Sequence, residues 1–211
     1  MEAVLQESAP GDEVLYIEPD WSRPLDVERT LAKVPDSAQV KGIFLDGVEK
    51  IVARDVEDGV KRLYQGLVRD RYVAFKSYSR AEVMRVEVRS AELLFPELPL
   101  RDALRKAAQK VYPFFLESMV GRVLFGVLGN DVDTVIRLGP KGYRMVTNFG
   151  AVQAHHLGER HWRYHFQDYY SWLDCGDVGI VEGIILHYGF TPKVRVGRVG
   201  QFDVWLDIQW E

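Results

Sequence analysis

Apolar residues recur every three or four positions through the first two-thirds of the chain. This spacing places them on one face of an α-helix, so it predicts a series of amphipathic helices. Pro24 suits the first turn of a short helix at the start of this region. Longer helices are expected over 40–52, 55–71, 80–94 and 100–111.

The last helix before the pattern changes is expected to be short. An aspartate at 131 or 133 can cap its beginning, because a carboxylate accepts hydrogen bonds from the first helical turn. Its end is expected by Gly139 and Pro140, because proline donates no backbone hydrogen bond. Residues 143–149 are then expected to form a strand.

Beyond residue 142 the period of the apolar residues changes from about 3.6 to 2. Trp162, Tyr164 and Phe166 alternate with polar residues, which is typical of a strand with one buried face and one solvated face. Gly158 and Glu159 predict a hairpin turn before this strand. We therefore expect the three aromatic side chains to point together toward covering helices.

The end of the chain is expected to add a helix and a second hairpin. Residues 178–188 are strongly apolar, and Gly179 and Gly183 lie one helical turn apart, which would let this helix approach a sheet closely. Residues 193–198 and 202–210 then alternate as two strands. On the second strand the even-numbered residues are expected to be buried and Asp203, Asp207 and Gln209 to face solvent.

The predicted order is helices-β-β-β-α-β-β, which is typical of an α+β fold. We expect an N-terminal helical bundle packed on one face of a C-terminal antiparallel sheet. Residues 1–23 are predicted to be a mobile acidic lead-in with one short strand near 14–17. Residues 24–211 are predicted to form a single domain, with a helical part at 24–142 and a sheet part at 143–211.

Composition excludes several classes of protein. The formal charge of −4 and the burial expected for the aromatic residues give little support to a nucleic-acid platform. No apolar stretch reaches the roughly 20 residues of a membrane span. One cysteine, Cys175, forms no intrachain disulfide and indicates a reducing compartment, so we expect a cytoplasmic protein.

The sequence contains no recognisable catalytic, phosphate-binding or metal-binding motif, so we expect no catalytic residues, no metal and no cofactor. Four of the five histidines fall within 155–165, and a hairpin at Gly158 would place His156 opposite His161. Two imidazoles are too few for a recognisable metal site. His161 and His165 are therefore expected to lie on a solvated strand face.

Several segments of the chain form a recognisable set: Phe95–Arg105, Tyr112, Gly121–Phe125, Gly179–Gly183, Gly189 and Trp210. Together they resemble a protein family of unknown function restricted to the Myxococcales, over roughly residues 38–211. The order of elements is also similar to the superfamily of haem nitric-oxide-binding domains, four-vinyl-reductase domains and transport-particle subunits. That resemblance implies a shared scaffold, while the histidine and Tyr-x-Ser-x-Arg pattern of the haem proteins is not matched.

A pocket is predicted where Pro113 removes a helical hydrogen bond at the start of the apolar run 114–128, because a kinked helix packs unevenly on its neighbours. Large aromatic side chains and a flexible methionine suit an apolar guest. The expected lining residues are Phe114, Phe115, Met119, Trp162, Tyr164 and Phe166.

These expectations favour a non-enzymatic sensory or regulatory module that binds a small apolar ligand or a protein partner, as a homodimer. One alternative is a haem-dependent or metal-dependent gas or redox sensor that uses His187, or His156 with His161. Another alternative is an enzyme with an unrecognised site around Cys175, Asp177 and Tyr170.

Overall fold

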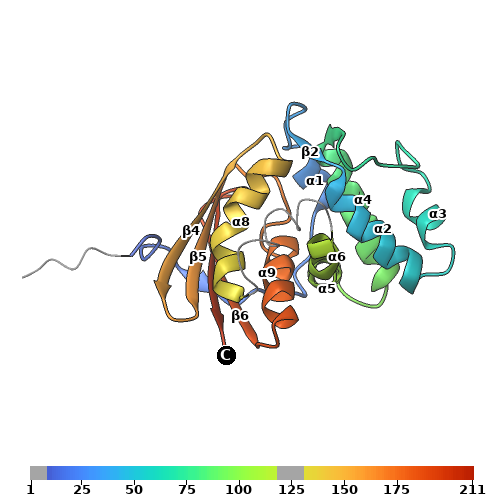
Figure 1. The fold of residues 1–211 in the computed structure, drawn as a ribbon. Helices are drawn as coiled ribbons and strands as arrows, with labels where there is room; N and C mark the ends of the chain where they lie inside the picture. Colours follow the sequence, from blue (N-terminus) through green and yellow to red (C-terminus); the bar gives the residue numbers. More distant parts are fainter. Residues whose placement is uncertain (1–8, 118–130) are drawn as a thin grey trace, which may run out of the picture.

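Five strands form one antiparallel sheet in the order β1-β6-β7-β5-β4, and helices pack on one of its faces (Figure 1). The computed structural model describes residues 9–117 and 131–211. The strands of this sheet are β1 (Tyr16–Ile17), β4 (Ala151–Gly158), β5 (His161–Gln167), β6 (Pro192–Arg198) and β7 (Val204–Trp210). The predicted α+β class, both predicted hairpins and the short strand in the lead-in are confirmed.

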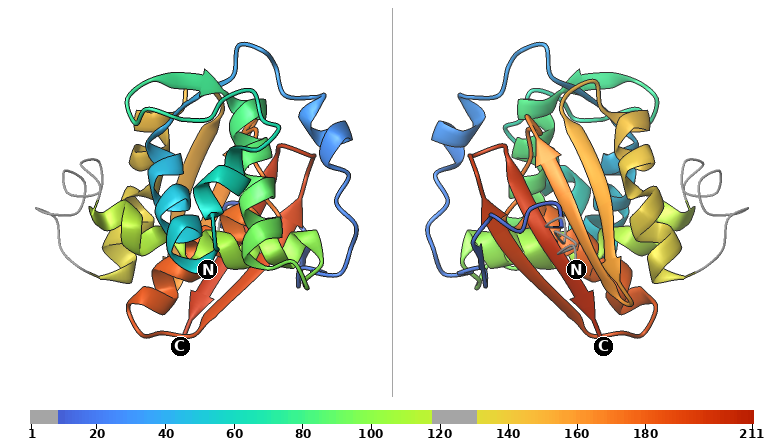
Figure 2. Two further views of the ribbon diagram at one scale, coloured as in Figure 1. Left: turned by 90° about the vertical axis from the view of Figure 1, so that its right-hand side faces the viewer. Right: turned by 90° about the vertical axis from the view of Figure 1, so that its left-hand side faces the viewer.

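Among the residues that the structure describes, two helices lie directly on the sheet and the remaining helices form a further layer beyond them (Figures 1 and 2). The two helices on the sheet are α8 (Val132–Val146) and α9 (Gly176–His187). The outer layer contains α1 (Val27–Leu31), α2 (Ile43–Asp55), α3 (Gly59–Tyr64), α4 (Arg80–Leu94), α5 (Leu100–Gln109) and α6 (Val111–Glu117). A small ladder of β2 (Gln39–Lys41) and β3 (Ser77–Ser79) lies beside α4.

Helix α9 is buried on two sides, which explains why it is apolar around almost its whole circumference. One side contacts β6 and β7, and the opposite side contacts α5. A β-carbon at Gly179 or Gly183 would overlap a backbone carbonyl oxygen of α5. The glycines therefore permit a close approach as predicted, but the approach is to a helix and not to the sheet.

Helix α8 continues through Pro140 to Val146, so the predictions of a helix end at Gly139 and of a strand over 143–149 were wrong. Pro140 has no N–H to donate to the carbonyl oxygen of Ile136, one turn earlier. The hydroxyl group of Tyr164 on β5 donates a hydrogen bond to that oxygen instead. A β-carbon at Gly139 would overlap this hydroxyl group, so the glycine makes the bond possible.

The inner face of the sheet follows the predicted alternation. Trp162, Tyr164 and Phe166 are all buried beneath the helices, as the pattern of β5 predicts. Their neighbours include Ile136 and Tyr143 of α8. The pairing of β5 with β4 and β7 fixes this register along the strand.

The outer face of the sheet is less exposed than the sequence predicts, because the N-terminal segment crosses it (Figure 2). The guanidinium group of Arg163 donates to the carbonyl oxygen of Pro10 at 2.9 Å and to Asp12 at 2.6 Å. Asp207 is only 1% exposed and also binds His161 at 2.8 Å. The predictions of a solvated Asp207 and a solvated histidine face were therefore wrong.

Two helices predicted in the N-terminal part differ from their expected bounds. The segment predicted as a helix over 40–52 begins as strand β2 and becomes helical only at Ile43, so α2 is shifted toward the C-terminus and ends at Asp55. The segment predicted as a helix over 55–71 is helical only over α3 and is therefore much shorter than expected. Pro113 lies in the first turn of α6, where no intrahelical N–H is required, so it separates α5 from α6 rather than kinking one helix.

We expect Tyr164→Phe to cost about 1–3 kcal/mol of unfolding free energy, because it leaves the buried carbonyl oxygen of Ile136 without a donor. In a Pro140→Ala background the N–H at position 140 supplies that bond, so the same substitution should cost much less. Urea denaturation of the four proteins in this double-mutant cycle measures both losses. Equal losses in the two backgrounds would contradict this assignment.

Candidate functional site

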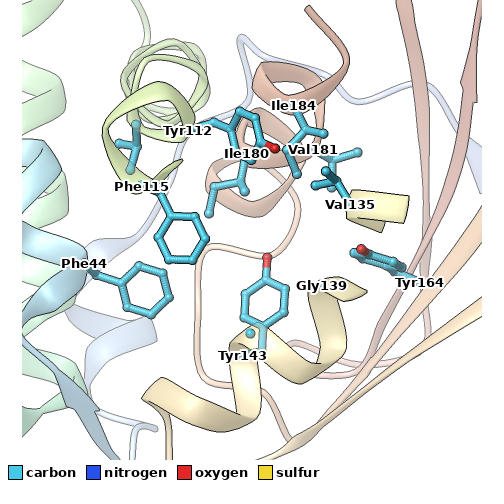
Figure 3. Close-up of a pocket in the computed structure, with 12 residues that line it drawn as sticks. Phe44, Tyr112, Phe115, Val135, Gly139, Tyr143, Tyr164, Ile180, Val181 and Ile184 are labelled. Atoms are coloured by element: carbon cyan, nitrogen blue, oxygen red, sulfur yellow. The ribbon is translucent and has the colours of Figure 1, made fainter. Parts of the chain in front are cut away.

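An apolar cavity of about 80 Å³ lies between the outer helices and the layer formed by α8, α9 and the sheet (Figure 3). Both layers contribute aromatic side chains, and Phe44 and Phe115 stack with ring centroids 6.5 Å apart. The cavity is lined by Phe44, Val111, Tyr112, Phe115, Val135, Gly139, Gly142, Tyr143, Tyr164, Ile180, Val181 and Ile184. Its walls therefore join the two layers of the fold.

The sequence of α8 accounts for part of the hollow. Gly139 and Gly142 lie three residues apart on one helical face and present no side chain to the cavity. The hydroxyl group of Tyr164 is held on Ile136, so its ring cannot move into the space without losing that bond. The cavity is thus a consequence of the same contacts that attach α8 to the sheet.

Two smaller cavities, of about 70 and 40 Å³, adjoin the first. Phe44 and Ile180 line all three, so these two side chains separate the spaces from one another. Together the three volumes exceed the roughly 150 Å³ of a protein cavity that holds benzene. A rotation of Phe44 is the simplest movement that would connect them.

The smallest cavity has a charged wall. Arg80 is 6% exposed, and it binds Glu87 at 2.7 and 3.1 Å and the hydroxyl group of Ser171 at 3.0 Å. Ser171 donates in turn to Asp177 at 2.5 Å. Two carboxylates and one guanidinium group therefore lie together next to the apolar cavity, and of these Arg80 and Asp177 are buried.

Burial raises the pKa of Asp177 from 3.8 to about 6. The hydrogen bond from Ser171 and the charge of Arg80 oppose this rise but do not cancel it, and the charge of Glu87 adds to it. Tyr143, which lines both this cavity and the 80 Å³ cavity, has its hydroxyl group 3.4 Å from Asp177. The protonation of Asp177 thus changes the charge directly behind the apolar cavity.

The structure brings together two of the six predicted lining residues, Phe115 and Tyr164. Phe114 packs instead beneath the guanidinium group of Arg54 on α2. Phe166 packs against Tyr143 and Tyr169 in the core, and the indole N–H of Trp162 donates to Asp133 at 2.7 Å. Met119 lies outside the residues that the structure describes.

Sequence reasoning missed most of the lining residues for two reasons. Tyr143 and Gly142 were assigned to the wrong element or to its edge, because α8 was expected to end at Pro140. Phe44 and Ile180 fall within segments predicted as apolar helix faces, and the spacing of apolar residues gives no sign that a cavity lies between them. Gly139 and Gly142 of α8, three residues apart, are the one sequence signal that could have indicated a helix face without side chains, and therefore a cavity beside it.

The histidines do not assemble a metal site in the described part of the chain. A bulge between His156 and Gly158 places His156 opposite Trp162 and His161 opposite Gly158, so the expected neighbours are not paired. Residues 9–117 and 131–211 contain no group of three histidine, cysteine or carboxylate side chains positioned to hold an ion. The same residues include no helix long and apolar enough to cross a bilayer.

The described contacts of Cys175, Tyr170 and Asp177 do not combine them into a catalytic group. Burial raises the pKa of the Cys175 thiol well above its usual range, so the thiol stays protonated. Tyr170 contributes its carbonyl oxygen to Arg80. The carboxyl group of Asp177 accepts hydrogen bonds from the hydroxyl groups of Ser171 and Tyr143.

A family model of proteins of unknown function, DUF2378, matches residues 33–211. The chain belongs to this family. The comparison with curated proteins finds no match for this DUF2378 chain.

The fold of this DUF2378 chain is that of H-NOX proteins. An H-NOX protein from S. oneidensis in the Fe(II)NO ligation state has a TM-score of 0.65 at 15% identity, over 81% of this chain and 99% of that one. An Fe(II) unliganded H-NOX protein from K. algicida has a TM-score of 0.60 at 10% identity, over 81% and 96%. At sequence identities of 10–15% this structural similarity shows a shared fold only.

The described cavity residues of the DUF2378 chain do not fit a haem group. No imidazole or thiolate is among the side chains that line the 80 Å³ cavity, and the hydroxyl groups of its three tyrosines are hydrogen-bonded to Tyr188, to Asp177 and to the carbonyl oxygen of Ile136. The described lining therefore offers iron no free side chain of the kinds that usually ligate haem. His187 is exposed and contacts the ring of Tyr112 from outside the cavity. The nearest buried guanidinium group, Arg80, is already bound to Glu87 and Ser171.

The raised pKa of Asp177 predicts a pH-dependent stability. Because folding raises this pKa from 3.8 to about 6, the folded protein holds the proton more tightly than the unfolded chain does. The stabilisation is complete below about pH 4 and is lost as the pH rises to about 6, with a size of about 3 kcal/mol. Asp177→Asn should therefore gain about 3 kcal/mol relative to the wild type between pH 4 and pH 7.

Urea denaturation at intervals of one pH unit measures this difference, with Asp36→Asn as the matched control at an exposed position. A difference between Asp177→Asn and wild type that stays constant from pH 4 to pH 7 would show that Asp177 has an ordinary pKa.

Proposed function

We propose that this protein is a non-enzymatic regulatory module that binds a small apolar molecule in the cavity between Phe115 and Tyr164. The observation that supports the proposal is the composition of the cavity wall, which is apolar and includes residues of both layers. A guest in such a position would contact α2 and α6 on one side and α8 and α9 on the other. Occupancy would therefore bias how the two layers pack, which is the property that a sensor needs.

The size of the cavity limits the guest. At about 80 Å³ it is about half the volume that holds benzene in another protein, so a diatomic gas or a similarly small molecule fits without rearrangement. A guest the size of an aromatic ring requires Phe44 to move and join the adjoining cavities. Such a guest would thereby displace the Phe44 side chain of α2 from its stack on Phe115.

The buried charged group beside the cavity would make ligand binding by the proposed module depend on pH. Asp177 and Arg80 lie behind Tyr143 and Ile180, so an apolar guest would bury this pair further from water. Ionisation of Asp177 would then be less favourable with the guest bound. Ligand binding is accordingly expected to weaken as the pH rises through 6.

The remaining alternatives have less support in the described residues. A haem sensor would require an axial ligand, and the described cavity lining has no histidine or cysteine and only tyrosines whose hydroxyl groups are already hydrogen-bonded. An absorption spectrum of the purified protein with a Soret band would favour the haem sensor over this proposal. A homodimer and a protein partner stay predictions, and sedimentation analysis tests the first of them.

Benzene is a suitable probe for the proposed site, since a tenfold excess over its dissociation constant adds about 1.4 kcal/mol of stability. For a chain of this length we expect the Tm of the wild type to rise by roughly 3–6 °C. Val135→Phe, which places a ring in the cavity, should abolish the rise. Leu186→Phe is the matched control, because Leu186 is 48% exposed on α9, and it should respond like the wild type.

Calorimetric melting curves with and without benzene measure these shifts. If Val135→Phe folds and still shows the full rise, benzene binds elsewhere and the assignment of the site is wrong. If benzene leaves the Tm of the wild type unchanged, the cavity does not accept guests of this size.

A further inference from the structure

A larger recess, of about 370 Å³, lies at the surface and shares Ser171 and Trp172 with the 70 Å³ cavity. Four separate segments form it: the region from Arg23 to Lys33 that includes α1, Arg101 of α5, the loop that contains Trp172 and Asp174, and the end of β6 at Arg198 with the following turn at Gln201. Its volume falls in the usual range of small-molecule sites. We refer to it as the arginine cleft.

Positive charge is concentrated in the arginine cleft although the whole chain is acidic. Three guanidinium groups converge on a single oxygen, Oδ2 of Asp174. Arg23 lies at 2.8 Å from it, and Arg101 and Arg198 each lie at 2.5 Å. Five cationic residues line the cleft against two carboxylates: Arg23, Arg29, Lys33, Arg101 and Arg198 against Asp26 and Asp174.

One carboxylate oxygen cannot satisfy three guanidinium groups, each of which has five N–H donors. Arg101 is 6% exposed, and within the described residues its Nε has no hydrogen-bond partner. The indole nitrogen of Trp172, which is 3% exposed, is also without a partner there. Buried donors without acceptors are costly, and the three guanidinium groups around Asp174 have more N–H donors than its one oxygen can accept. These guanidinium groups can therefore bind further acceptor atoms.

We propose that the arginine cleft binds the phosphate group of a small phosphorylated molecule. A phosphate group has several acceptor oxygens and more than one negative charge, so it can bind the three arginines more completely than one carboxylate does. Pro24, Leu25 and Trp172 also line the cleft and provide apolar surface for the rest of such a ligand. Asp174 occupies the arginines in the absence of the ligand.

The loop that carries Trp172 also connects this cleft with the apolar cavities. Ser171 and Trp172 line both the arginine cleft and the 70 Å³ cavity. Ser171 is in addition hydrogen-bonded to Arg80 and Asp177. The proposed phosphate site does not depend on the proposed apolar ligand, and each can be tested without the other.

Isothermal titration calorimetry with pyrophosphate, ATP and adenosine tests the proposal. We expect pyrophosphate and ATP to bind with dissociation constants below about 1 mM at low salt, and to bind more weakly as salt is added. Adenosine should not bind. Tighter binding of ATP than of pyrophosphate would identify an organic phosphate as the ligand, and equal binding would identify an inorganic one.

Two substitutions in the cleft should change the affinity in opposite directions. Arg198→Met removes one of the three guanidinium groups from a side chain that is 40% exposed, and it should weaken binding at least tenfold without unfolding the protein. Asp174→Asn removes the competing charge and should strengthen binding about tenfold. Lys61→Met, which removes an exposed charge on α3, is the control and should leave the affinity unchanged.

A purely structural role for the cleft gives a different result. Asp174→Asn would then lower the stability and leave phosphate binding absent, as in the wild type. Absence of pyrophosphate and ATP binding, or binding that Arg198→Met and Lys61→Met reduce equally, would overturn the proposal. If Asp174→Asn does not fold, the comparison of Arg198→Met with Lys61→Met decides the question alone.

Discussion

The hydrogen bond from Tyr164 to the carbonyl oxygen of Ile136 is the contact on which the arrangement of the inner layer depends. Pro140 leaves that oxygen without its helical partner, and Gly139 gives the tyrosine room to reach it. Helix α8 is thereby attached to the middle of β5 at the turn where the helix lacks one of its own backbone hydrogen bonds. The same glycine-containing face of α8 also borders the apolar cavity. One local defect in a helix thus explains both how the helix is held and why space remains beside it.

Helix α9 has the complementary role in this arrangement. Its glycines bring it against α5 on one side, while its apolar residues pack on the sheet on the other. The helix carries Ile180, which borders all three cavities, and Asp177, which belongs to the buried charged group. Ser171 and Trp172, just before α9, lead from that group to the arginine cleft. A displacement of α9 would therefore change the apolar cavity and the charged sites together.

Local patterns predicted the fold well and the candidate site poorly, for physical reasons. The alternation around Tyr164 and the spacing in α4 depend on neighbouring residues, so the sequence shows them directly. The continuation of α8 past Pro140 depends on a donor 24 positions away in the chain, and a local rule for proline cannot include it. The burial of Asp207 likewise depends on the distant N-terminal segment around Asp12. The cavity is the hardest of these features to predict, because it lies where Gly139 and Gly142 have no side chains to fill the space.

The space between the two layers should accept a small apolar guest, and a crystal of the protein pressurised with xenon can show whether it does. Xenon enters dry apolar cavities and is visible in the electron density. We expect a xenon atom among Phe115, Val135 and Tyr164, and none there in Val135→Phe. Xenon density confined to other places, with this space empty under pressure, would show that the cavity accepts no guest.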